Sequence, residues 1–562
     1  MNSVMIQNNK KYFTFQNQVI EFSFNSSKIY KDPFNEIDLD VIFIDPNGKK
    51  LMVPAFWDGE NIWRVRYSSC VIGNHKFLTK CSNNEDEELN NHSGEIKILQ
   101  YRGNNNLLKH GRLKVSDNFL YLKHVDGTPF LWLGDTWWFA FAKRFEWPEI
   151  FKIMTEDRTR KGFNVVQIIA GFYGDSGKEF TENDENEAGS VWDKEFRSIN
   201  PTYFDVADIK IFWLIHSNII PCIFGAWGYY LPWLGIEKMK KHWRYIIARW
   251  GAYPVVWCVA GEARMPYYYM DYKKEKEMIK EQTKGWAIIS AYIREIDPFN
   301  NLITIHPSPR DGSYSSRNIL EDSSLFDIDM LQTGQYGKDV LEFSLKKVHE
   351  SLNSKPKKPV INGEVCYEGN MGSFWQETQR FLFWTHMLSG SSGFTYGAEG
   401  IWEFRRKDDY LGKSGRWGEA FWDDAINFLG SKQVGGSKKF LEKFEWYRFI
   451  PKPEWVSPNY TEGNLYLPYC AGIPKEVRII YMPGLFFYDS TYTLKNMKIV
   501  DIESNIIYKA YYFNPRTGNI SKKITVKPNK KREWALSPIE KMEGWRTPNP
   551  SMEDWLLILE KE

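Results

Sequence analysis

The order of hydrophobic and polar positions divides the 562-residue chain into three regions. From about residue 8 to residue 115, short runs of alternating strand-forming residues are separated by turn signals such as the Asp-Pro-Asn-Gly of residues 45–48. Alternation with a period of two is typical of strands that bury one face. We therefore predict an N-terminal β-sandwich over residues 1–116.

The middle region has a different rhythm, in which apolar strand-like runs alternate with helical segments. This alternation is typical of βαβ units, and eight repeats over roughly 300 residues match the size of a closed parallel barrel. We predict a (β/α)8 TIM barrel over residues 117–445. Its eight expected strands lie at 130–138, 164–174, 219–228, 255–262, 302–310, 327–337, 359–369 and 392–400.

The last region returns to short strands, for example at 464–472, 476–484 and 554–561. We predict a second, smaller β-sandwich over residues 446–562. The predicted fold class is therefore α/β: a (β/α)8 barrel flanked by an N-terminal and a C-terminal β-sandwich.

The predicted barrel strands share a polarity. Each begins with apolar residues and ends with polar or aromatic ones. Barrels of this type assemble their active sites at the carboxyl ends of the strands, so we expect the chemistry there. The strand-end residues are Asp135, Asp175, Trp227, Glu262, His306, Gln335, Glu364 and Glu399.

Two of these residues form the candidate catalytic pair. Glu262 and Glu364 end the fourth and seventh strands, and glycoside hydrolysis needs two carboxyl groups that flank the scissile bond. Each follows a glycine, Gly261 or Gly363, which we expect to leave room for a ligand. The structural alternative is that one glutamate pairs with a nearby arginine such as Arg264. Finding both glutamates at strand ends favours the catalytic interpretation.

A further set of strand-end residues is predicted to bind substrate. Aromatic rings can stack on the apolar faces of sugars, and polar groups can bind hydroxyls. Structural alternatives stay open: Asp135 as a cap, Trp227 and Tyr229 as core residues, and His306 as a hydrogen-bonded core residue. Glu399 is the reserve carboxylate. The full set is Asp135, Trp137, Trp227, Tyr229, His306, Gln335, Tyr336, Tyr396, Glu399 and Trp402.

Composition narrows the range of functions. Aromatic residues make up 16% of the chain, and the formal net charge is only +2, so no basic excess suggests a nucleic-acid or membrane-surface partner. Nine histidines lack metal-ligand spacing, and no glycine-rich nucleotide motif follows a strand, so we expect neither a metal site nor a cofactor. Six scattered cysteines and a start without an apolar core favour a cytoplasmic location, or a secreted one if the natural start was trimmed.

Four stretches of the predicted barrel resemble the apiosidase-like family of glycoside hydrolases, within clan A. They are DGTPFLWLGDTWW, EDRTRKGFNVVQ, PVVWCVAGE and KPVINGEVCYEG. The first region resembles the β-sandwich that often precedes this barrel. AYYFNPRTGN and EDWLLILEK resemble the family's trailing domain, which carries a collagen-binding label. The resemblance therefore covers nearly the whole chain.

The resemblance implies roles for the two glutamates. Clan A enzymes carry their acid/base after strand four and their nucleophile after strand seven, which implies Glu262 as acid/base and Glu364 as nucleophile. It also implies a tyrosine of strand six, here Tyr336, against the nucleophile. Retention of configuration predicts carboxyl groups about 5–5.5 Å apart, whereas inversion predicts about 6.5–9.5 Å.

This chain departs from the family pattern at two points. Gly261 stands where many clan A enzymes have asparagine. Glu262 stands where apiosidase-like relatives often have the aspartate of a Gly-Gly-Asp. A longer acid would meet the leaving group differently, so specificity for apiose does not carry over.

The leading hypothesis is a hydrolase of oligosaccharides derived from plant or microbial polysaccharides, acting by a retaining two-carboxylate mechanism. The alternatives are a non-catalytic carbohydrate-binding protein and a transglycosidase on the same barrel. We expect a saccharide partner, neither nucleic acid nor membrane, and leave a homo-oligomer open.

Overall fold

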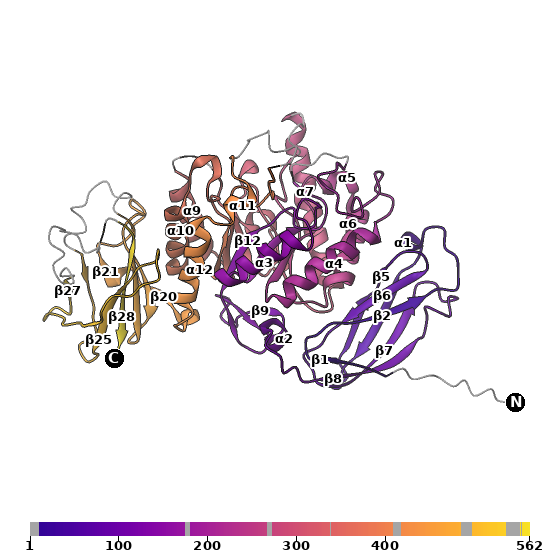
Figure 1. Ribbon diagram of the computed structural model, residues 1–562, viewed down its shortest axis with the longest axis horizontal. Helices are drawn as coiled ribbons and strands as arrows, with labels where there is room; N and C mark the ends of the chain where they lie inside the picture. The colour runs from indigo at the N-terminus through magenta and orange to yellow at the C-terminus, as the bar shows by residue number, and fades with distance from the viewer. Residues whose placement is uncertain are drawn as a thin grey trace.

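A computed structural model places a central barrel between two β domains (Figure 1). It describes residues 11–174, 180–266, 272–335, 337, 339–407, 418–484, 497–535, 551 and 553–562. No helix in these ranges is long and apolar enough to cross a membrane.

Eight parallel strands form the barrel, in the order β16-β15-β14-β13-β12-β19-β18-β17. The ring is nearly closed between β16 and β17, where the Asp327 amide donates to the Ile303 carbonyl at 2.7 Å. All eight predicted strands are present, so the predicted fold class is confirmed. The strands are β12 (Trp132–Thr136), β13 (Val165–Ile169), β14 (Ile220–Phe224), β15 (Val256–Cys258), β16 (Leu302–Thr304), β17 (Asp329–Gln332), β18 (Val360–Glu364) and β19 (Gly393–Tyr396).

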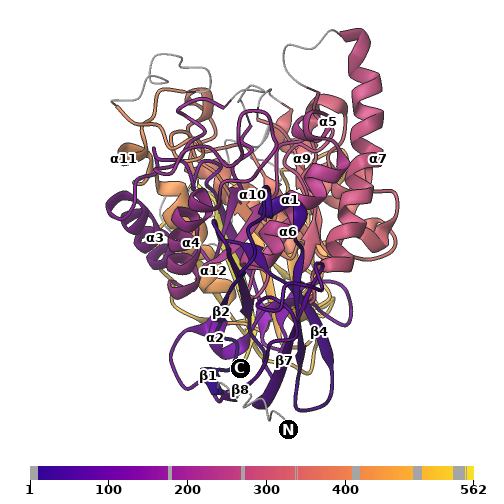
Figure 2. The same cartoon turned by 90° about the vertical axis from the view of Figure 1, so that its right-hand side faces the viewer.

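Helices cover the outside of the barrel, and the long helix α7 rises along one side (Figure 2). Two of them end at a glycine in the left-handed conformation, Gly162 after α3 and Gly390 after α10, which few other residues adopt without strain. The longer helices are α3 (Glu149–Lys161), α4 (Pro201–His216), α6 (Ile236–Trp250), α7 (Tyr272–Ile296), α9 (Val340–Asn353), α10 (Gln376–Ser389) and α12 (Leu429–Leu441). Short helices are α5 (Tyr230–Leu234), α8 (Ser316–Ile319) and α11 (Trp422–Ala425).

The N-terminal domain is a sandwich of two sheets. One has the order β1-β8-β7-β3-β4 and the other β2-β6-β5. Their facing side chains, including Phe22, Val41, Val65 and Phe77, form a hydrophobic core that Ala252 and Phe299 of the barrel join. The strands are β1 (Lys11–Phe15), β2 (Ile20–Asn25), β3 (Leu39–Ile44), β4 (Lys50–Pro54), β5 (Phe56–Trp57), β6 (Ile62–Tyr67), β7 (Gly73–Cys81) and β8 (Ser93–Leu99). The short helix α1 (Pro33–Glu36) lies between β2 and β3, while helix α2 (Asn106–His110) and strands β9 (Leu113–Val115), β10 (Leu122–His124) and β11 (Pro129–Phe130) lead into the barrel.

The C-terminal domain also has two sheets, of six and three strands. The larger sheet packs directly on barrel helices: the Phe440 ring of α12 stacks on Phe513 with centroids 3.8 Å apart, and Arg380 of α10 contacts Asp554 at 2.7 Å. The larger sheet contains β20 (Ile450–Pro451), β22 (Tyr469–Ile473), β23 (Val477–Met482), β28 (Trp555–Lys561), β25 (Tyr508–Phe513) and β26 (Ile524–Thr525). The smaller contains β21 (Val456–Ser457), β24 (Lys498–Ile499) and β27 (Trp534–Ala535).

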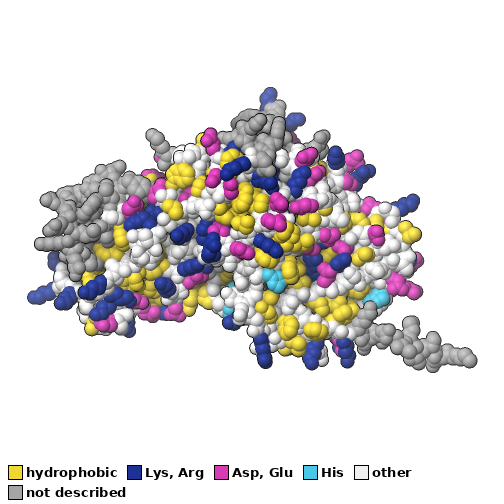
Figure 3. Space-filling model, viewed as in Figure 1, with side chains coloured by type: hydrophobic (Ala, Val, Ile, Leu, Met, Phe, Trp, Pro, Cys, Tyr) yellow, Lys and Arg dark blue, Asp and Glu magenta, His cyan; other side chains and the backbone are white. Residues whose placement is uncertain are grey.

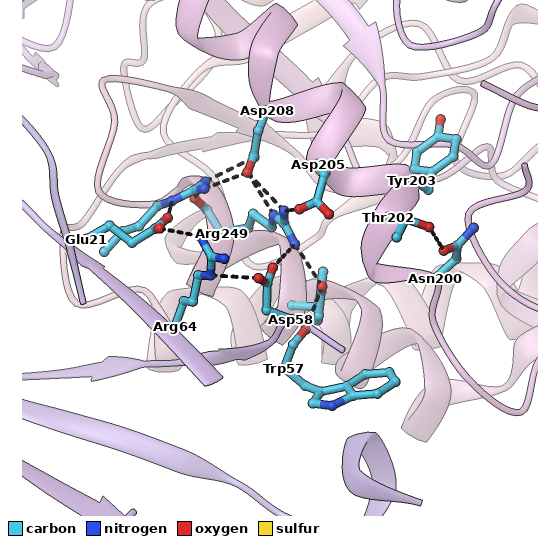
Figure 4. A network of polar contacts seen from close by, with 12 residues as sticks. Glu21, Trp57, Asp58, Arg64, Asn200, Thr202, Tyr203, Asp205, Asp208 and Arg249 are labelled. Atoms are coloured by element: carbon cyan, nitrogen blue, oxygen red, sulfur yellow. Dashed lines mark hydrogen bonds and ion pairs between the residues drawn. The ribbon is translucent and has the colours of Figure 1, made fainter. Parts of the chain in front are cut away.

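A network of ion pairs joins the N-terminal sandwich to barrel helices α4 and α6 (Figure 4). Asp208 of α4 accepts from Arg66 of β6 at 2.5 Å and from Arg249 of α6 at 3.0 Å. Arg249 also contacts Asp58 of the sandwich at 3.3 Å and Asp205 of α4. Burial by itself would raise the pKa of the Asp208 carboxyl, but the charges of Arg66 and Arg249 outweigh it and lower that pKa.

Asp208→Ala is expected to destabilise the protein by about 3–5 kcal/mol, because it leaves two buried guanidinium groups without their shared partner. The matched control is Asp205→Ala, which removes a half-exposed carboxylate on the same helix and should cost about 1 kcal/mol or less. Urea unfolding at pH 7 measures both values. Equal losses for the two variants would contradict the central role of Asp208.

Candidate active site

The carboxyl ends of the barrel strands bring Glu262, His306 and Glu364 together. Glu364 is the last residue of β18, while Glu262 and His306 follow β15 and β16. The fully buried His306 ring lies between the two glutamates. Its Nδ1 faces the Glu262 amide at 3.4 Å, and its Nε2 lies 3.4 Å from Glu364 Oε2. Because the amide can only donate, Nδ1 is its acceptor, and Nε2 is the ring nitrogen that faces Glu364.

Two glutamines from the end of β17 orient the two carboxylates. Gln332 Nε2 donates to Glu262 Oε1 at 3.0 Å, and Gln335 Nε2 donates to Glu364 Oε1 at 2.9 Å. The Tyr367 amide donates in turn to Gln335 Oε1 at 2.9 Å, which fixes the orientation of that amide group. Gln335, which was predicted to contact substrate, lies on the Glu364 carboxylate. No local sequence pattern indicates Gln332, because its place in the site depends on a contact with residue 262, far away in the chain.

Glu262 has an unusual backbone. Its φ of +40° lies in the left-handed region, which is unfavourable for residues with a side chain. Neighbouring contacts hold this conformation: the Ala263 amide donates to the His306 carbonyl at 3.0 Å, and the Met265 amide donates to the Glu262 carbonyl at 2.8 Å. Such strain persists where the surrounding structure imposes it, which is common at functional sites.

The two glycines before the glutamates do not open space for a ligand, so that expectation is wrong. A Cβ at Gly261 would lie 2.3 Å from the Trp227 ring, and a Cβ at Gly363 would lie 2.6 Å from Met330. Both glycines instead allow a neighbouring side chain to pack against the strand. Arg264, the arginine named as an alternative partner, forms an ion pair with Asp311.

Aromatic residues form a wall beside His306. The Trp138 ring lies 5.7 Å from Trp227 and 5.8 Å from His306, centroid to centroid. Trp137, the predicted residue, points the other way and packs on Phe145 with centroids 5.2 Å apart. The chain turns at Trp138, just after β12, so the side chains of the two tryptophans diverge and only Trp138 reaches the site.

Three predicted substrate-binding residues, Asp135, Trp137 and Tyr396, lie between the barrel and its helices and not beside the glutamate pair. Asp135 Oδ2 accepts from Arg158 of α3 at 2.6 Å and from the Trp137 indole at 2.8 Å, and the carboxylate is fully buried. The Tyr396 hydroxyl donates to Glu368 at 2.6 Å.

The remaining predicted residues differ in their surroundings. Tyr229 is buried, and its hydroxyl donates to the Tyr173 carbonyl at 3.3 Å. Trp402 is partly exposed, and its ring lies 6.4 Å from that of Tyr367. Tyr336 and Asp175 lie outside the described residues.

Tyr367 is a neighbour of Glu364 that the sequence did not reveal. Burial, and then the charge of Glu364, raise the pKa of the Tyr367 hydroxyl well above its ordinary value. The hydroxyl therefore stays protonated and can donate. A Cβ at Gly397 would lie 2.1 Å from the Tyr367 ring, so this glycine of the loop after β19 lets the ring pack there.

Glu399 is a buried carboxyl on the strand-eight side of the mouth. The Trp402 indole lies 3.5 Å from its Oε2, and Oε1 has no hydrogen-bond partner among the residues that the structure describes. Burial, followed by the charge of Glu403, raises the pKa of Glu399 to about 7, although Arg405 opposes the shift. At lower pH it is a neutral acid, which suits a hydrogen-bonding role better than that of a nucleophile.

The arrangement as a whole supplies two carboxyl groups, an imidazole and an aromatic wall on one rim. No group of three or more His, Cys, Asp or Glu side chains in the described part of the chain is placed to hold a metal ion. The chemistry that these residues can perform is proton transfer and nucleophilic attack by carboxyl groups.

The sequence profile of the apiosidase-like catalytic domain matches residues 116–448, more than half of the chain. The chain belongs to the apiosidase-like family. It is therefore a glycoside hydrolase, and its substrate is a carbohydrate. A domain of unknown function, DUF5060, matches residues 15–82 of the N-terminal sandwich.

Solved structures share the fold of this apiosidase-like enzyme. A glycoside hydrolase is 21% identical, with a TM-score of 0.62, and the match covers 80% of this chain and 97% of the other. A glycoside hydrolase family 5 protein from Bacteroides vulgatus ATCC 8482 is 22% identical, with a TM-score of 0.62 and coverage of 80% and 94%. A candidate glycoside hydrolase from the same strain is 17% identical, with a TM-score of 0.67 and coverage of 99% and 100%. None of the curated proteins matches the chain.

Gly261→Ala is expected to lower kcat/KM of the apiosidase-like enzyme about 100-fold, because the new methyl group displaces Trp227 and the adjoining Glu262. The control is Gly436→Ala in helix α12, where no atom lies within 4 Å of the added Cβ. That variant should keep its activity and gain about 0.5–1 kcal/mol of stability. Steady-state kinetics and urea unfolding test the pair, and unchanged kinetics for Gly261→Ala would contradict this account.

Glu399→Gln is expected to stabilise the apiosidase-like enzyme at pH 8 but not at pH 5. The pKa of Glu399 rises from 4.5 to about 7 on folding, so stability falls as pH rises through this window and levels off above it. The variant cannot ionise, so it should exceed wild type by about 3 kcal/mol at pH 8 and by under about 1 kcal/mol at pH 5. Urea unfolding at both pH values measures the difference. A variant that is less stable than wild type at pH 8 would contradict the prediction, because it would show that the fold stabilises the ionised Glu399 carboxylate.

Proposed function

We propose that the enzyme cleaves glycosidic bonds in oligosaccharides derived from plant or microbial polysaccharides, with retention of configuration. Glu262 is the general acid/base and Glu364 the nucleophile, within a catalytic unit of residues 117–445. The observation that carries this proposal is the placement of both glutamates on one rim, at the ends of β15 and β18, with His306 between them.

The contacts of Glu364 hold its carboxyl group in one orientation. Gln335 donates to Oε1 at 2.9 Å, and His306 Nε2 lies 3.4 Å from Oε2. A fixed orientation prepares a carboxylate for attack, which a nucleophile requires. Gln332 holds Glu262 Oε1 at 3.0 Å and so fixes the direction of the acid.

The reaction follows from these roles. Glu262 gives its proton to the leaving oxygen while Glu364 attacks the anomeric carbon, which forms a covalent glycosyl ester and releases the alcohol. Glu262, now ionised, takes a proton from water as that water attacks the same carbon and frees Glu364. We propose that Trp138, Trp227 and Trp402 contact the sugar ring, with Tyr229 behind them and Glu399 near Trp402.

A transglycosidase would use the same two carboxylates, with a sugar hydroxyl in place of water in the second step. A non-catalytic carbohydrate-binding protein would have no need of two glutamates that are each held by a glutamine. The contacts of both carboxylates therefore favour turnover over binding alone.

Substitutions of the two glutamates should impair hydrolysis in different ways. Glu364→Gln is expected to lower kcat/KM about 10⁴-fold or more on every substrate, because no glycosyl ester can form. Glu262→Gln should lower kcat/KM about 10²–10⁴-fold on oligosaccharides, but much less on dinitrophenyl glycosides, whose leaving group needs no proton. Hydrolysis of a panel of aryl glycosides and of pectic, xylan and arabinogalactan oligosaccharides measures both.

The stereochemistry of the product checks the mechanism independently. Proton NMR of the first product anomer should show the configuration of the substrate, as expected for carboxyl groups about 5–5.5 Å apart. An inverted product would contradict the nucleophilic role of Glu364 while leaving hydrolysis in place. A sugar that raises the Tm of a wild-type protein unable to cleave it would favour the binding protein.

A further inference from the structure

The outer face of the five-stranded N-terminal sheet exposes large hydrophobic side chains. Such a face is normally polar when the opposite face is buried. Here Phe13 and Phe15 on β1 are 69% and 38% exposed, Met52 on β4 is 56% exposed, and Leu78 on β7 is 40% exposed. We call this surface the outer sheet face.

The strand register shows that these side chains form rows. Leu78 lies opposite Ile42 of β3, and Ile42 lies opposite Met52, so one apolar row crosses three strands. Phe13 and Phe15 are two residues apart on β1 and therefore point to the same side. Their sequence neighbour Thr14 is buried, as are residues next to the others, so these positions face outward.

Lysines alternate with these apolar rows. One row of the ladder reads Lys11, Glu95, Lys76, Ile44 and Lys50 across all five strands. Lys97 lies opposite Phe13.

The acidic residues of the outer sheet face do not cancel its positive charge. Asp40 is paired with Arg244 of the barrel at 2.7 Å, and Glu95 lies between two lysines in the ladder. The formal charge of the whole chain is only +2, so the excess here is local. Yellow and dark blue side chains alternate along the lower edge of the N-terminal sandwich in Figure 3.

The part of the outer sheet face that β1, β8 and β7 form is turned away from the barrel. The other sheet, β2-β6-β5, contacts the barrel through Arg66 to Asp208 and through the Trp57 carbonyl to the Tyr245 hydroxyl, while β3 contributes only its end, where Asp40 pairs with Arg244. Because the two sheets pack back to back, the five-stranded sheet presents its second face to solvent (Figure 1). A ligand on this face would therefore not compete with a sugar at the barrel mouth.

We propose that the outer sheet face binds an acidic polysaccharide built from uronic acid residues. Each such residue offers a carboxylate to a lysine and an apolar C–H face to a phenyl ring or an aliphatic side chain. A second copy of this chain fits less well, because two identical lysine-bearing faces would repel each other. The proposal rests on the proposed function: the polymer held here is the kind of polysaccharide from which the oligosaccharide substrates of the barrel derive, and tethering raises their local concentration.

Affinity electrophoresis in native gels that contain polygalacturonate tests the proposal. The wild-type protein should be retarded, and Lys76→Glu/Lys97→Glu should weaken the apparent affinity about tenfold or more. Phe13→Ala/Phe15→Ala should weaken it by a smaller factor. The matched control, Lys276→Glu/Lys280→Glu, makes the same charge change on exposed positions of α7 and should migrate like wild type relative to a gel without polymer.

Further arms separate the proposal from its competitors. Neutral galactan should not retard the protein, and high salt should abolish retardation because it screens exposed charges. Retardation of Lys76→Glu/Lys97→Glu equal to that of wild type would overturn the proposal. Equal retardation by galactan, or equally tight binding of duplex DNA, would overturn it too, since the face would then not select a uronate chain.

The result is independent of the catalytic assignment. Glu364→Gln should be retarded as strongly as wild type, while Lys76→Glu/Lys97→Glu should hydrolyse short oligosaccharides at the wild-type rate. Loss of hydrolysis therefore reports on the barrel, and loss of retardation reports on the outer sheet face.

Discussion

The hydrogen-bonded ring of eight parallel strands is the constraint on which the rest of the molecule depends. Parallel pairing in a barrel places every strand end with the same polarity on one rim. Glu262 and Glu364 are about a hundred residues apart in the chain, yet they share one histidine on that rim. Strand-to-strand pairing alone provides the frame that holds the two carboxyl groups at a fixed separation.

Within that frame, the alternation of side chains divides the rim into two environments. Trp138 points toward His306, whereas Trp137 and Asp135 point toward α3 and its arginine. The second environment is also polar, but each of its charges has a partner: Arg158 lies on Asp135, and Tyr396 lies on Glu368. A buried charge is tolerable only with such a partner, so these residues support the barrel wall.

Ion pairs and packing attach the two β domains in different ways. The N-terminal sandwich meets the barrel through the buried charges around Asp208 and through Ala252 and Phe299 of the barrel, which join the core of the sandwich. The C-terminal sheet shares the hydrophobic core of the barrel through α10 and α12, as the stacked rings of Phe440 and Phe513 illustrate. The N-terminal arrangement leaves the β1-β8-β7 side of the outer sheet face in solvent, where lysines and exposed phenylalanines are arranged in rows.

The sequence by itself determined the eight strands, the flanking β domains and the strand ends that carry Glu262 and Glu364, because these follow from local periodicity and from the repeat of the βαβ unit. The domain boundaries, between residues 116 and 117 and between residues 445 and 446, remain predictions. Only the tertiary structure decided which strand-end residues share an environment. It turned Trp137, Asp135 and Tyr396 outward, and it placed Gln332 and Gln335 on the two glutamates. Those outcomes depend on how the chain turns after each strand ends and on contacts between residues far apart in the chain. No local sequence pattern encodes either of them.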